Sequence, residues 1–227
     1  DNFRGRNERL NIAGRFFYNP SFNFSYYIPW IGKKLHLFTG ISGGWQSTWN
    51  RSLSAVGKTG EYGALTYGDV NFQNIQYTAR LTLGKYFGKF FSVFTNFGYN
   101  FLRVTQYAPG RTVSDDGVDR YLTFDLGVTY DTRDINEYAT KGIYFKTDYL
   151  RSGFIDSEVS FGRYSLENES YIPVNITKSY YITAASRIYT SIGMGAVIPL
   201  YDNQFLGYGD NYVRGWNRYT FEGDNVL

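Results

Sequence analysis

The stretch QNIQYTARLTLGK, residues 73–85, alternates apolar and polar side chains without a break. One face carries Ile75, Tyr77, Ala79, Leu81 and Leu83, and the other carries Asn74, Gln76, Thr78, Arg80 and Thr82. A side-chain period of two is typical of a β-strand, and no helix reproduces it over such a length. The sequence therefore predicts a long strand with two unlike faces.

The same alternation recurs along the chain and predicts an all-β, antiparallel fold. It is found in segments 10–18, 22–28, 35–45, 93–101, 121–131, 143–149 and 180–188. Segment 157–171 alternates poorly, but its neighbours require a strand there. We expect about nine strands, with a tenth beginning near Asn225.

The length of these strands and the charges on their polar face favour a transmembrane barrel. Strands in soluble domains usually have five or six residues, whereas a tilted transmembrane strand needs nine to eleven. The polar face holds Arg80, Asp125, Lys146, Asp148 and Arg187. Turning Arg80 or Arg187 toward lipid would cost roughly 2–4 kcal/mol each at the midplane. We therefore expect the polar face to line a watery interior and the apolar face to contact lipid.

Composition supports this interpretation and excludes several classes of site. Aromatic residues make up 20% of the chain, including 23 Tyr and 19 Phe, which suits strands and interfacial girdles. There is no Cys, so there is no disulfide framework or thiolate metal site. The net charge of +3 is scattered and forms no basic stripe for a nucleic acid. The periodicity also fits a soluble sandwich or lipocalin-like barrel, but strand length, tyrosine content and loop pattern favour the membrane barrel.

The predicted connections alternate in length, as in outer-membrane barrels with short periplasmic turns and long outer loops. Short connections are predicted at 29–33, 87–89, 132–141 and 173–177, and long ones at 47–71, 107–118 and 193–222. Two connections, near Asn19–Pro20 and near Phe154–Asp156, are short although the alternation places them among the outer loops. A sheet in a bilayer cannot leave its edges unpaired, so we expect the chain to be a fragment of a larger barrel. A barrel closing on ten strands is the alternative.

The long loop near the C-terminus contains a recognisable motif, Val213-Arg214-Gly215-Trp216. It resembles the conserved loop of the BamA/TamA superfamily of outer-membrane assembly and translocation barrels, where Val or Leu, Arg and Gly precede an aromatic residue. That aromatic residue is usually Phe or Tyr, so Trp216 is a mild departure.

Two further stretches are similar to the same superfamily. Tyr130-Asp131-Thr132-Arg133-Asp134, followed by a turn and Gly142, resembles its strand–turn–strand motif, with residues 139–141 where Pro often stands. Residues 3–10 resemble its Gly-x-Gly-x-x-Leu strand entry, with Asn7 replacing a Gly. The order and spacing fit the middle of a sixteen-stranded barrel, from about the third strand to the start of the twelfth.

The resemblance implies that residues 1–227 belong to one outer-membrane barrel domain whose loop 193–222 folds into the lumen. Arg214 would pair there with an acidic residue on a later strand, for which Asp125 and Asp148 are substitutes within this chain. Gly215 would allow close backbone approach, and Trp216 would pack on the wall. The alternative is an ordinary exposed arginine in a polar loop.

The function implied by the resemblance is the folding and insertion of other barrel proteins into the bacterial outer membrane. Its partners would be outer-membrane lipid, unfolded outer-membrane proteins, and periplasmic or lipoprotein accessory subunits, with no cofactor. The alternatives are a two-partner-type polypeptide secretion barrel, a barrel anchor for a patatin-like phospholipase, or a plain porin.

Two candidate chemical sites fail on inspection, so we expect no enzyme activity and no metal. Residues 40–44 fit the G-x-S-x-G pattern, but Ser42 lies in an alternating strand and the only histidine, His36, precedes it. The acids of Asp131–Asp134 are too few for a cation site. We interpret that segment as a turn-stabilising charge cluster.

Overall fold

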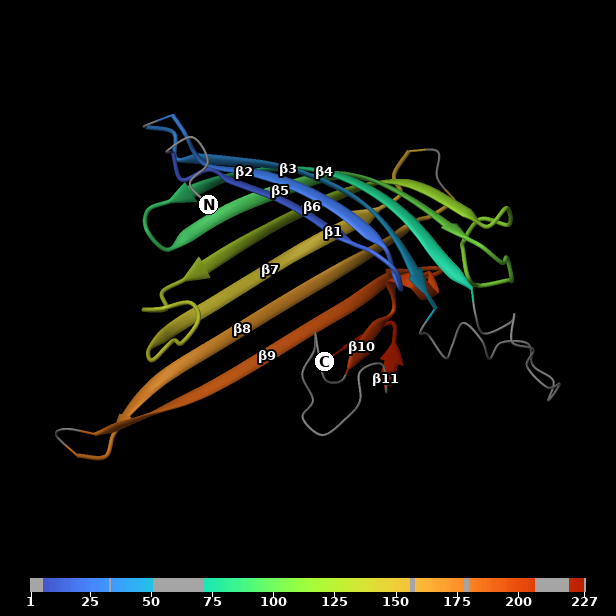
Figure 1. Cartoon of the computed structure of the whole chain (residues 1–227). Helices are drawn as coiled ribbons and strands as arrows, with labels where there is room; N and C mark the ends of the chain where they lie inside the picture. Colours follow the sequence, from blue (N-terminus) through green and yellow to red (C-terminus); the bar gives the residue numbers. More distant parts are fainter. Residues whose placement is uncertain are drawn as a thin grey trace.

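The computed structural model describes residues 6–32, 34–50, 72–155, 158–177, 180–206 and 221–226. Most of them form one nine-stranded antiparallel sheet whose strands follow one another in sequence order. Figure 1 shows this sheet as a strongly curved wall. Its strands are β1 (Arg9–Arg15), β2 (Ser21–Ile31), β3 (Leu37–Trp49), β4 (Gln73–Phe87), β5 (Phe91–Val104), β6 (Val118–Asp131), β7 (Gly142–Ser152), β8 (Phe161–Asn175) and β9 (Tyr181–Gly195).

The predicted set of strands is confirmed, including the poorly alternating one, which begins at Phe161. Val226 pairs with Ser191 of β9 as an isolated antiparallel bridge, where the sequence predicted a tenth strand to begin. The first strand is shorter than predicted, because it ends at Arg15 and the chain then takes positive φ at Phe17 and Asn19. Two turns begin later in the sequence than predicted, because β2 continues to Ile31 and β8 to Asn175.

The register between strands keeps the two predicted faces separate across the sheet. Pairing between β4 and β5 runs unbroken from Asn74 opposite Val104 to Phe87 opposite Phe91. Between β2 and β3 the register shifts after Ile28, next to Pro29. Proline has no N–H to give to the ladder, which is why it is tolerated at such an irregularity. A slip of one residue elsewhere would exchange the faces, so this register fixes which side chains point outward.

The apolar side of the sheet, hereafter the outer face, leaves large hydrophobic side chains uncovered. Leu81, Leu126 and Ile188 are 39%, 49% and 58% exposed. The opposite side, the inner face, carries the predicted charged residues and many Ser, Thr and Asn side chains. A wall of this kind is stable when lipid covers the outer face and water wets the inner one.

The connections fall into two groups at opposite ends of the sheet. At one end, the short-turn end, the chain passes from β2 to β3, from β4 to β5, from β6 to β7 and from β8 to β9. At the other, the long-loop end, it passes from β1 to β2, from β3 to β4, from β5 to β6 and from β7 to β8, and β9 ends there. Most of the buried apolar residues lie at the long-loop end, whereas buried Phe38 lies at the short-turn end of β3. Phe72, Leu102 and Val104 form one cluster, and Tyr121, Val159 and Phe161 form another. Tyr201 packs against both clusters and joins them into a small core.

The segment after β9 contains local structure where the sequence predicted only a loop. A 3-10 turn, η1 (Leu200–Asp202), precedes β10 (Gln204–Leu206), which pairs antiparallel with β11 (Phe221–Gly223). Figure 1 shows this hairpin near the end of β9, apart from the large sheet. Among the described residues, no helix is long and apolar enough to cross a membrane.

The two faces predict opposite responses to the same charged side chain. Leu81 lies on the outer face near the middle of β4, and Thr78 lies on the inner face of the same strand. We expect Leu81→Arg to lower the free energy of unfolding of the intact protein by about 2–4 kcal/mol. Thr78→Arg should change it little, because its side chain meets water. Urea titration in lipid vesicles measures both variants, and equal losses would contradict the assignment of the faces.

Candidate functional site

The predicted strand–turn motif forms a charge cluster at the short-turn end. Asp131 ends β6, and Arg133 follows in the turn. The Arg133 guanidinium donates from Nε to Asp131 Oδ1 at 3.0 Å and from Nη2 to Asp131 Oδ2 at 2.9 Å. Its Nη1 donates to Glu169 Oε2 of β8 at 2.8 Å, and its Cζ lies 4.3 Å from the centre of the Tyr144 ring. One arginine thus ties β6 to β8 across the intervening β7.

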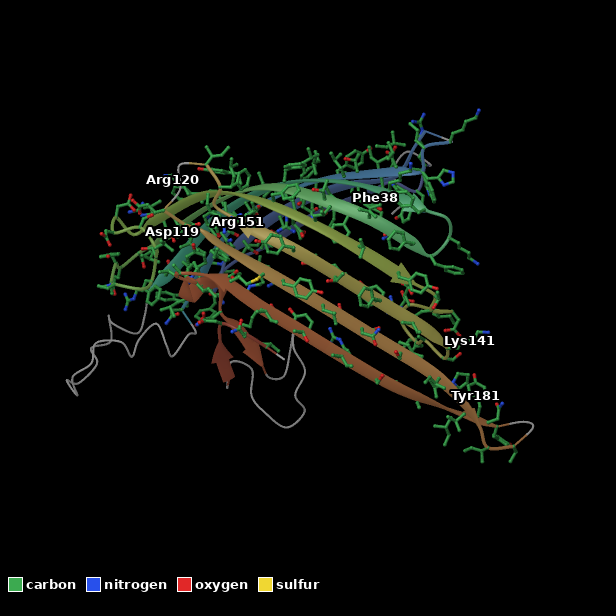
Figure 2. The ribbon with its side chains drawn as sticks, turned by 180° about the vertical axis from the view of Figure 1, so that it is seen from behind. Phe38, Asp119, Arg120, Lys141, Arg151 and Tyr181 are labelled. Carbon is green, nitrogen blue, oxygen red and sulfur yellow. The ribbon has the colours of Figure 1, made fainter. Side chains whose placement is uncertain are left out.

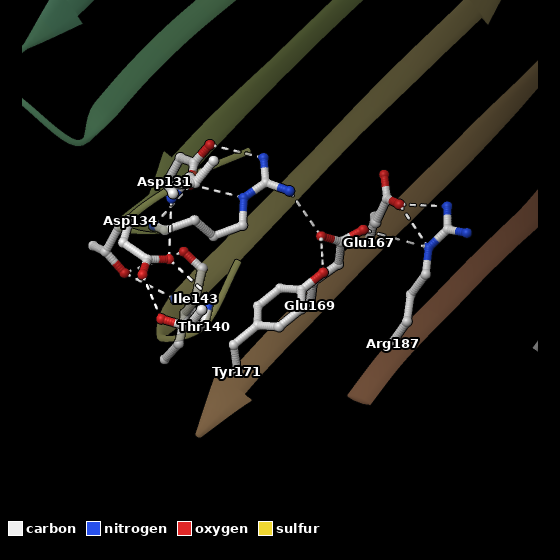
Figure 3. A network of polar contacts seen from close by, with 11 residues as sticks. Asp131, Asp134, Thr140, Ile143, Glu167, Glu169, Tyr171 and Arg187 are labelled. Atoms are coloured by element: carbon white, nitrogen blue, oxygen red, sulfur yellow. Dashed lines mark hydrogen bonds and ion pairs between the residues drawn. The ribbon is translucent and has the colours of Figure 1, made fainter. Parts of the chain in front are cut away.

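The cluster continues along β8 to β9 as a row of alternating charges, shown in Figure 3. The Tyr171 hydroxyl donates to Glu169 Oε2 at 3.1 Å. Arg187 Nε lies 3.7 Å from Glu169 Oε1 and donates to Glu167 Oε1 at 2.9 Å. We call Asp131, Arg133, Glu169, Arg187 and Glu167 the charge ladder. Because each charge has an opposite neighbour, the ladder fastens three strands at their short-turn end without leaving a lone charge on the wall.

Asp134 closes the turn that follows the ladder. Its Oδ1 accepts the backbone N–H groups of Ile135 at 3.0 Å and Thr140 at 2.9 Å, and its Oδ2 accepts the Thr140 hydroxyl at 2.6 Å. These hydrogen bonds, led by the one from the Thr140 side chain, hold the pKa of the Asp134 carboxyl well below its ordinary value. Asp134 is therefore a turn cap that stays ionised.

Gly142 opens the next strand in a conformation that needs glycine. Its φ is +109°, and a Cβ there would overlap the carbonyl of Thr132. The structure therefore brings Asp131, Arg133, Asp134 and Gly142 together in one turn. Tyr130 lies on the outer face instead, where its ring meets Phe90 edge-on at 6.5 Å between centroids. Within the described residues, no group of three or more His, Cys, Asp or Glu side chains could hold a metal ion.

A second cluster, which the sequence did not indicate, centres on Arg163 at the long-loop end of β8. Arg163 is only 6% exposed. Its Nε donates to Asp202 Oδ2 at 2.8 Å, and its Nη2 donates to the Asp202 carbonyl at 2.9 Å. Its Nη1 donates to the Asp224 carbonyl at 3.0 Å and to the Ser191 hydroxyl at 3.1 Å. Arg163 thus holds both ends of the segment between residues 202 and 224 against the inner face.

Further contacts surround this arginine and fix the same segment. Ser191 and Val226 exchange both backbone hydrogen bonds at 2.8 Å, and the Gly193 N–H donates to Asn225 Oδ1 at 2.7 Å. The Tyr201 ring stacks on Tyr121 of β6 with centroids 6.4 Å apart. We call Arg163, Asp202, Ser191, Asp224 and Val226 the loop anchor. No sequence signal identified it, because Arg163 lies in the strand with the weakest alternation.

The predicted lumen-loop motif, Val213, Arg214, Gly215 and Trp216, lies outside the described residues. The two acids considered as its partners both lie on the inner face. Asp148 pairs with Lys146 at 3.5 Å. Asp125 Oδ2 accepts a hydrogen bond from Asn96 Nδ2 at 2.6 Å, whereas its buried Oδ1 has no hydrogen-bond partner among the described residues.

The conformation of Gly142 predicts a specific sensitivity to a single methyl group. Gly142→Ala should lower the free energy of unfolding of the intact protein by about 2–5 kcal/mol, because positive φ and steric overlap both oppose the new Cβ. Gly88→Ala is the matched control, since Gly88 has φ +71° but no atom within 4 Å of an added Cβ. It should cost only about 1–2 kcal/mol in a urea titration. Equal losses would show that the contact with Thr132 does not matter.

The loop anchor predicts that Arg163 controls the opening of the segments that it holds. Arg163→Ala should accelerate amide hydrogen exchange in peptides covering 198–206 and 221–226 about tenfold or more, since each charge-assisted hydrogen bond contributes ~1.5–3 kcal/mol. Arg163→Lys should give an intermediate rate because it keeps the charge but loses the planar fork. Arg187→Ala, which breaks the charge ladder at the other end, should leave these rates unchanged. Unaltered exchange in Arg163→Ala would contradict the anchor.

Comparisons with known proteins agree with the fold and with the motifs. The family model described as the Omp85 superfamily domain matches residues 2–225. The chain is also similar in structure to BamA from Haemophilus ducreyi, in a crystal structure lacking POTRA domains 1–3, with a TM-score of 0.73 and 16% sequence identity.

That match covers 97% of this chain and 42% of the BamA chain, so the present chain spans less than half of the protein that it resembles. No curated protein matches the sequence. The structural likeness confirms the predicted fold, a BamA-like antiparallel barrel wall that is unclosed across the described strands. Since the family model covers nearly the whole sequence, this chain belongs to the Omp85 superfamily.

Proposed function

We propose that the intact protein folds and inserts other β-barrel proteins into the bacterial outer membrane. Support comes from superfamily membership over residues 2–225, from the BamA-like wall, and from the resemblance of Val213–Trp216 to the conserved superfamily loop. In this proposal residues 1–227 form part of one barrel domain. The short-turn end faces the periplasm and the long-loop end faces outward, as the usual distribution of connection lengths suggests.

The main support for the proposal is that Arg163 binds both ends of the segment that contains the motif. Asp202 precedes the motif and Asp224 follows it, and both bind the same buried guanidinium on the inner face. Holding both ends at one point reduces the conformational freedom of the residues between them. We infer that the loop 193–222 folds into the lumen from this fixed base.

Arg214 would then reach an acid inside the lumen, as the resemblance implies. Its planar fork suits bidentate pairing with a carboxylate. Within this chain Asp125 is the better candidate of the two acids, because one of its oxygens has no hydrogen-bond partner among the described residues and Asp148 already has Lys146. Gly215 would allow the close approach, and Trp216 would pack on the wall.

The partners proposed for this function are lipid, unfolded outer-membrane proteins, and periplasmic or lipoprotein accessory subunits. Lipid would contact the outer face, where apolar side chains are uncovered. Unfolded substrates would arrive from the periplasm at the short-turn end, where the charge ladder keeps the ends of β6, β8 and β9 in register. The proposal involves no cofactor and no catalytic residue.

The test is a reconstitution of the intact protein with its accessory subunits in lipid vesicles. Arg214→Ala should slow the folding of an added barrel substrate about tenfold or more, since a charge-assisted pair contributes ~1.5–3 kcal/mol. Arg218→Ala, in the same loop but outside the motif, should fold substrate at the wild-type rate. Protease protection and heat-modifiable gel mobility of the substrate measure the folded fraction.

Two outcomes would overturn the proposal. One is wild-type folding of the substrate by Arg214→Ala. The other is a wild-type protein that accelerates folding no more than empty vesicles do. Transport of a soluble polypeptide into the vesicles by the wild type would instead favour the secretion function.

A further inference from the structure

Three arginines lie on the outer face at the long-loop end, on three neighbouring strands. Arg103 is near the end of β5, Arg120 near the start of β6, and Arg151 near the end of β7. On each strand, the outward-facing residues between the arginine and the short-turn end carry no charge. The outward-facing neighbours of the arginines are Phe101, Leu122 and Tyr149 respectively. Figure 2 shows Arg120 and Arg151 at the end of the sheet opposite Lys141 and Tyr181. We call these three residues the arginine row.

The strand register places Arg103 and Arg120 side by side and Arg151 on the same face, four residues or ~13 Å farther along the strands. Phe101 is opposite Arg120 and Val118 is opposite Arg103, so the two arginines are diagonal neighbours on the same face. Arg151 is opposite Phe124 on the next strand pair. The Arg120 guanidinium lies 5.5 Å from the centre of the Phe101 ring, and Arg151 Nη2 donates to Ser160 Oγ at 2.7 Å. Arg120 therefore lies beside an aromatic ring of the wall, and Arg151 is held by a serine of the next connection.

The position of Arg103 along β5 matches the edge of a hydrocarbon layer. Outward-facing residues on β5 are uncharged from Phe91 to Phe101, which is about ten residues. At ~3.3 Å per residue and a tilt of ~40°, this stretch spans about 25 Å, the height of the apolar band of an outer-membrane barrel. Arg103 comes directly after it. Arg103 thus lies at the depth where acyl chains give way to headgroups, and Arg120 is its diagonal neighbour.

One acid beside the row makes an exposed ion pair with it. Asp116 Oδ2 lies 3.7 Å from Arg120 Nη1, with 55% and 59% of the two side chains exposed. Exposed pairs of this kind contribute little and are weakened by salt. The other oxygen of Asp116 accepts the Val118 N–H at 2.8 Å, and Asp115 accepts the Tyr107 hydroxyl at 3.1 Å. These acids are held by the loop beyond the strands, whereas the arginines lie on the lipid side.

We propose that the arginine row binds the phosphate groups of lipid headgroups in the leaflet at the long-loop end. Guanidinium groups bind phosphate oxygens bidentately, and three on adjacent strands suit a headgroup that carries more than one phosphate. The acyl chains of the same lipid would lie along Phe101, Leu122 and Phe124. This inference goes beyond the proposed function. It rests on the proposed orientation in the membrane but not on any insertion activity.

The test is native mass spectrometry of the intact protein with lipid A, a diglucosamine lipid carrying two phosphates, and with its dephosphorylated form. The wild type should bind the phosphorylated lipid in preference to the dephosphorylated one. Arg103→Gln, Arg120→Gln and Arg151→Gln should each weaken binding about fivefold, the effect of one charge near an anionic surface, and the triple variant more than tenfold. The triple lysine variant should bind better than the triple glutamine variant.

The control is Lys85→Gln with Lys89→Gln, which removes two cations that lie over Phe87 and Phe90 at the short-turn end. It should bind the lipid as the wild type does. Heat-modifiable gel mobility verifies folding of each variant, and the single variants decide the matter if the triple variant does not fold.

Equal binding by folded glutamine variants would overturn the proposal. So would equal binding of the dephosphorylated lipid, or displacement of the lipid by inorganic phosphate, which would indicate a free-anion site. Because binding is measured without a folding substrate, failure here leaves the proposed insertion function untouched, and failure of that function leaves this test valid.

Discussion

The pairing of backbone N–H and C=O groups across neighbouring strands is the constraint on which the structure depends. Inside a bilayer, an unpaired peptide group costs several kcal/mol because lipid offers it no hydrogen bond. The sheet meets this requirement with long strands in continuous antiparallel register, most clearly from β3 to β6. Once the backbone hydrogen bonds between strands are fixed, every side chain must point either outward or inward. The separation of lipid-facing and water-facing residues then follows.

The two ends of this wall are stabilised by different interactions. At the short-turn end, the charge ladder joins strands through paired ions on a wet surface, and Asp134 and Gly142 shape the tight turn. At the long-loop end, a small apolar core and one buried arginine hold the connections. A buried guanidinium must have its donors satisfied, because an unpaired buried charge is strongly destabilising. Arg163 meets this condition only when both ends of the last long loop are in place.

Consecutive side chains on one strand thus lie in different surroundings. In β6, Asp119 points inward, where it accepts the N–H groups of Val113 and Ser114 at 3.0 and 2.9 Å and organises a long loop. Arg120, the next residue, points outward over Phe101 toward the lipid side. Asp119 is fully buried and Arg120 is exposed. The same alternation that builds the wall therefore supplies an acid that organises a long loop on one face and a member of the arginine row on the other.

The sequence by itself determined the strands, their two faces and the superfamily, because the period of two and the short motifs are local properties of the chain. The Asp131–Asp134 turn was predictable for the same reason, since its partners lie within a few residues. Only the tertiary structure decided that Arg133 pairs with Glu169, or that Arg163 joins Asp202 and Asp224. Those contacts depend on register and curvature accumulated over several strands, and on a loop that folds back. No local pattern of residues specifies register and curvature over several strands, so only the folded chain shows which distant charges pair.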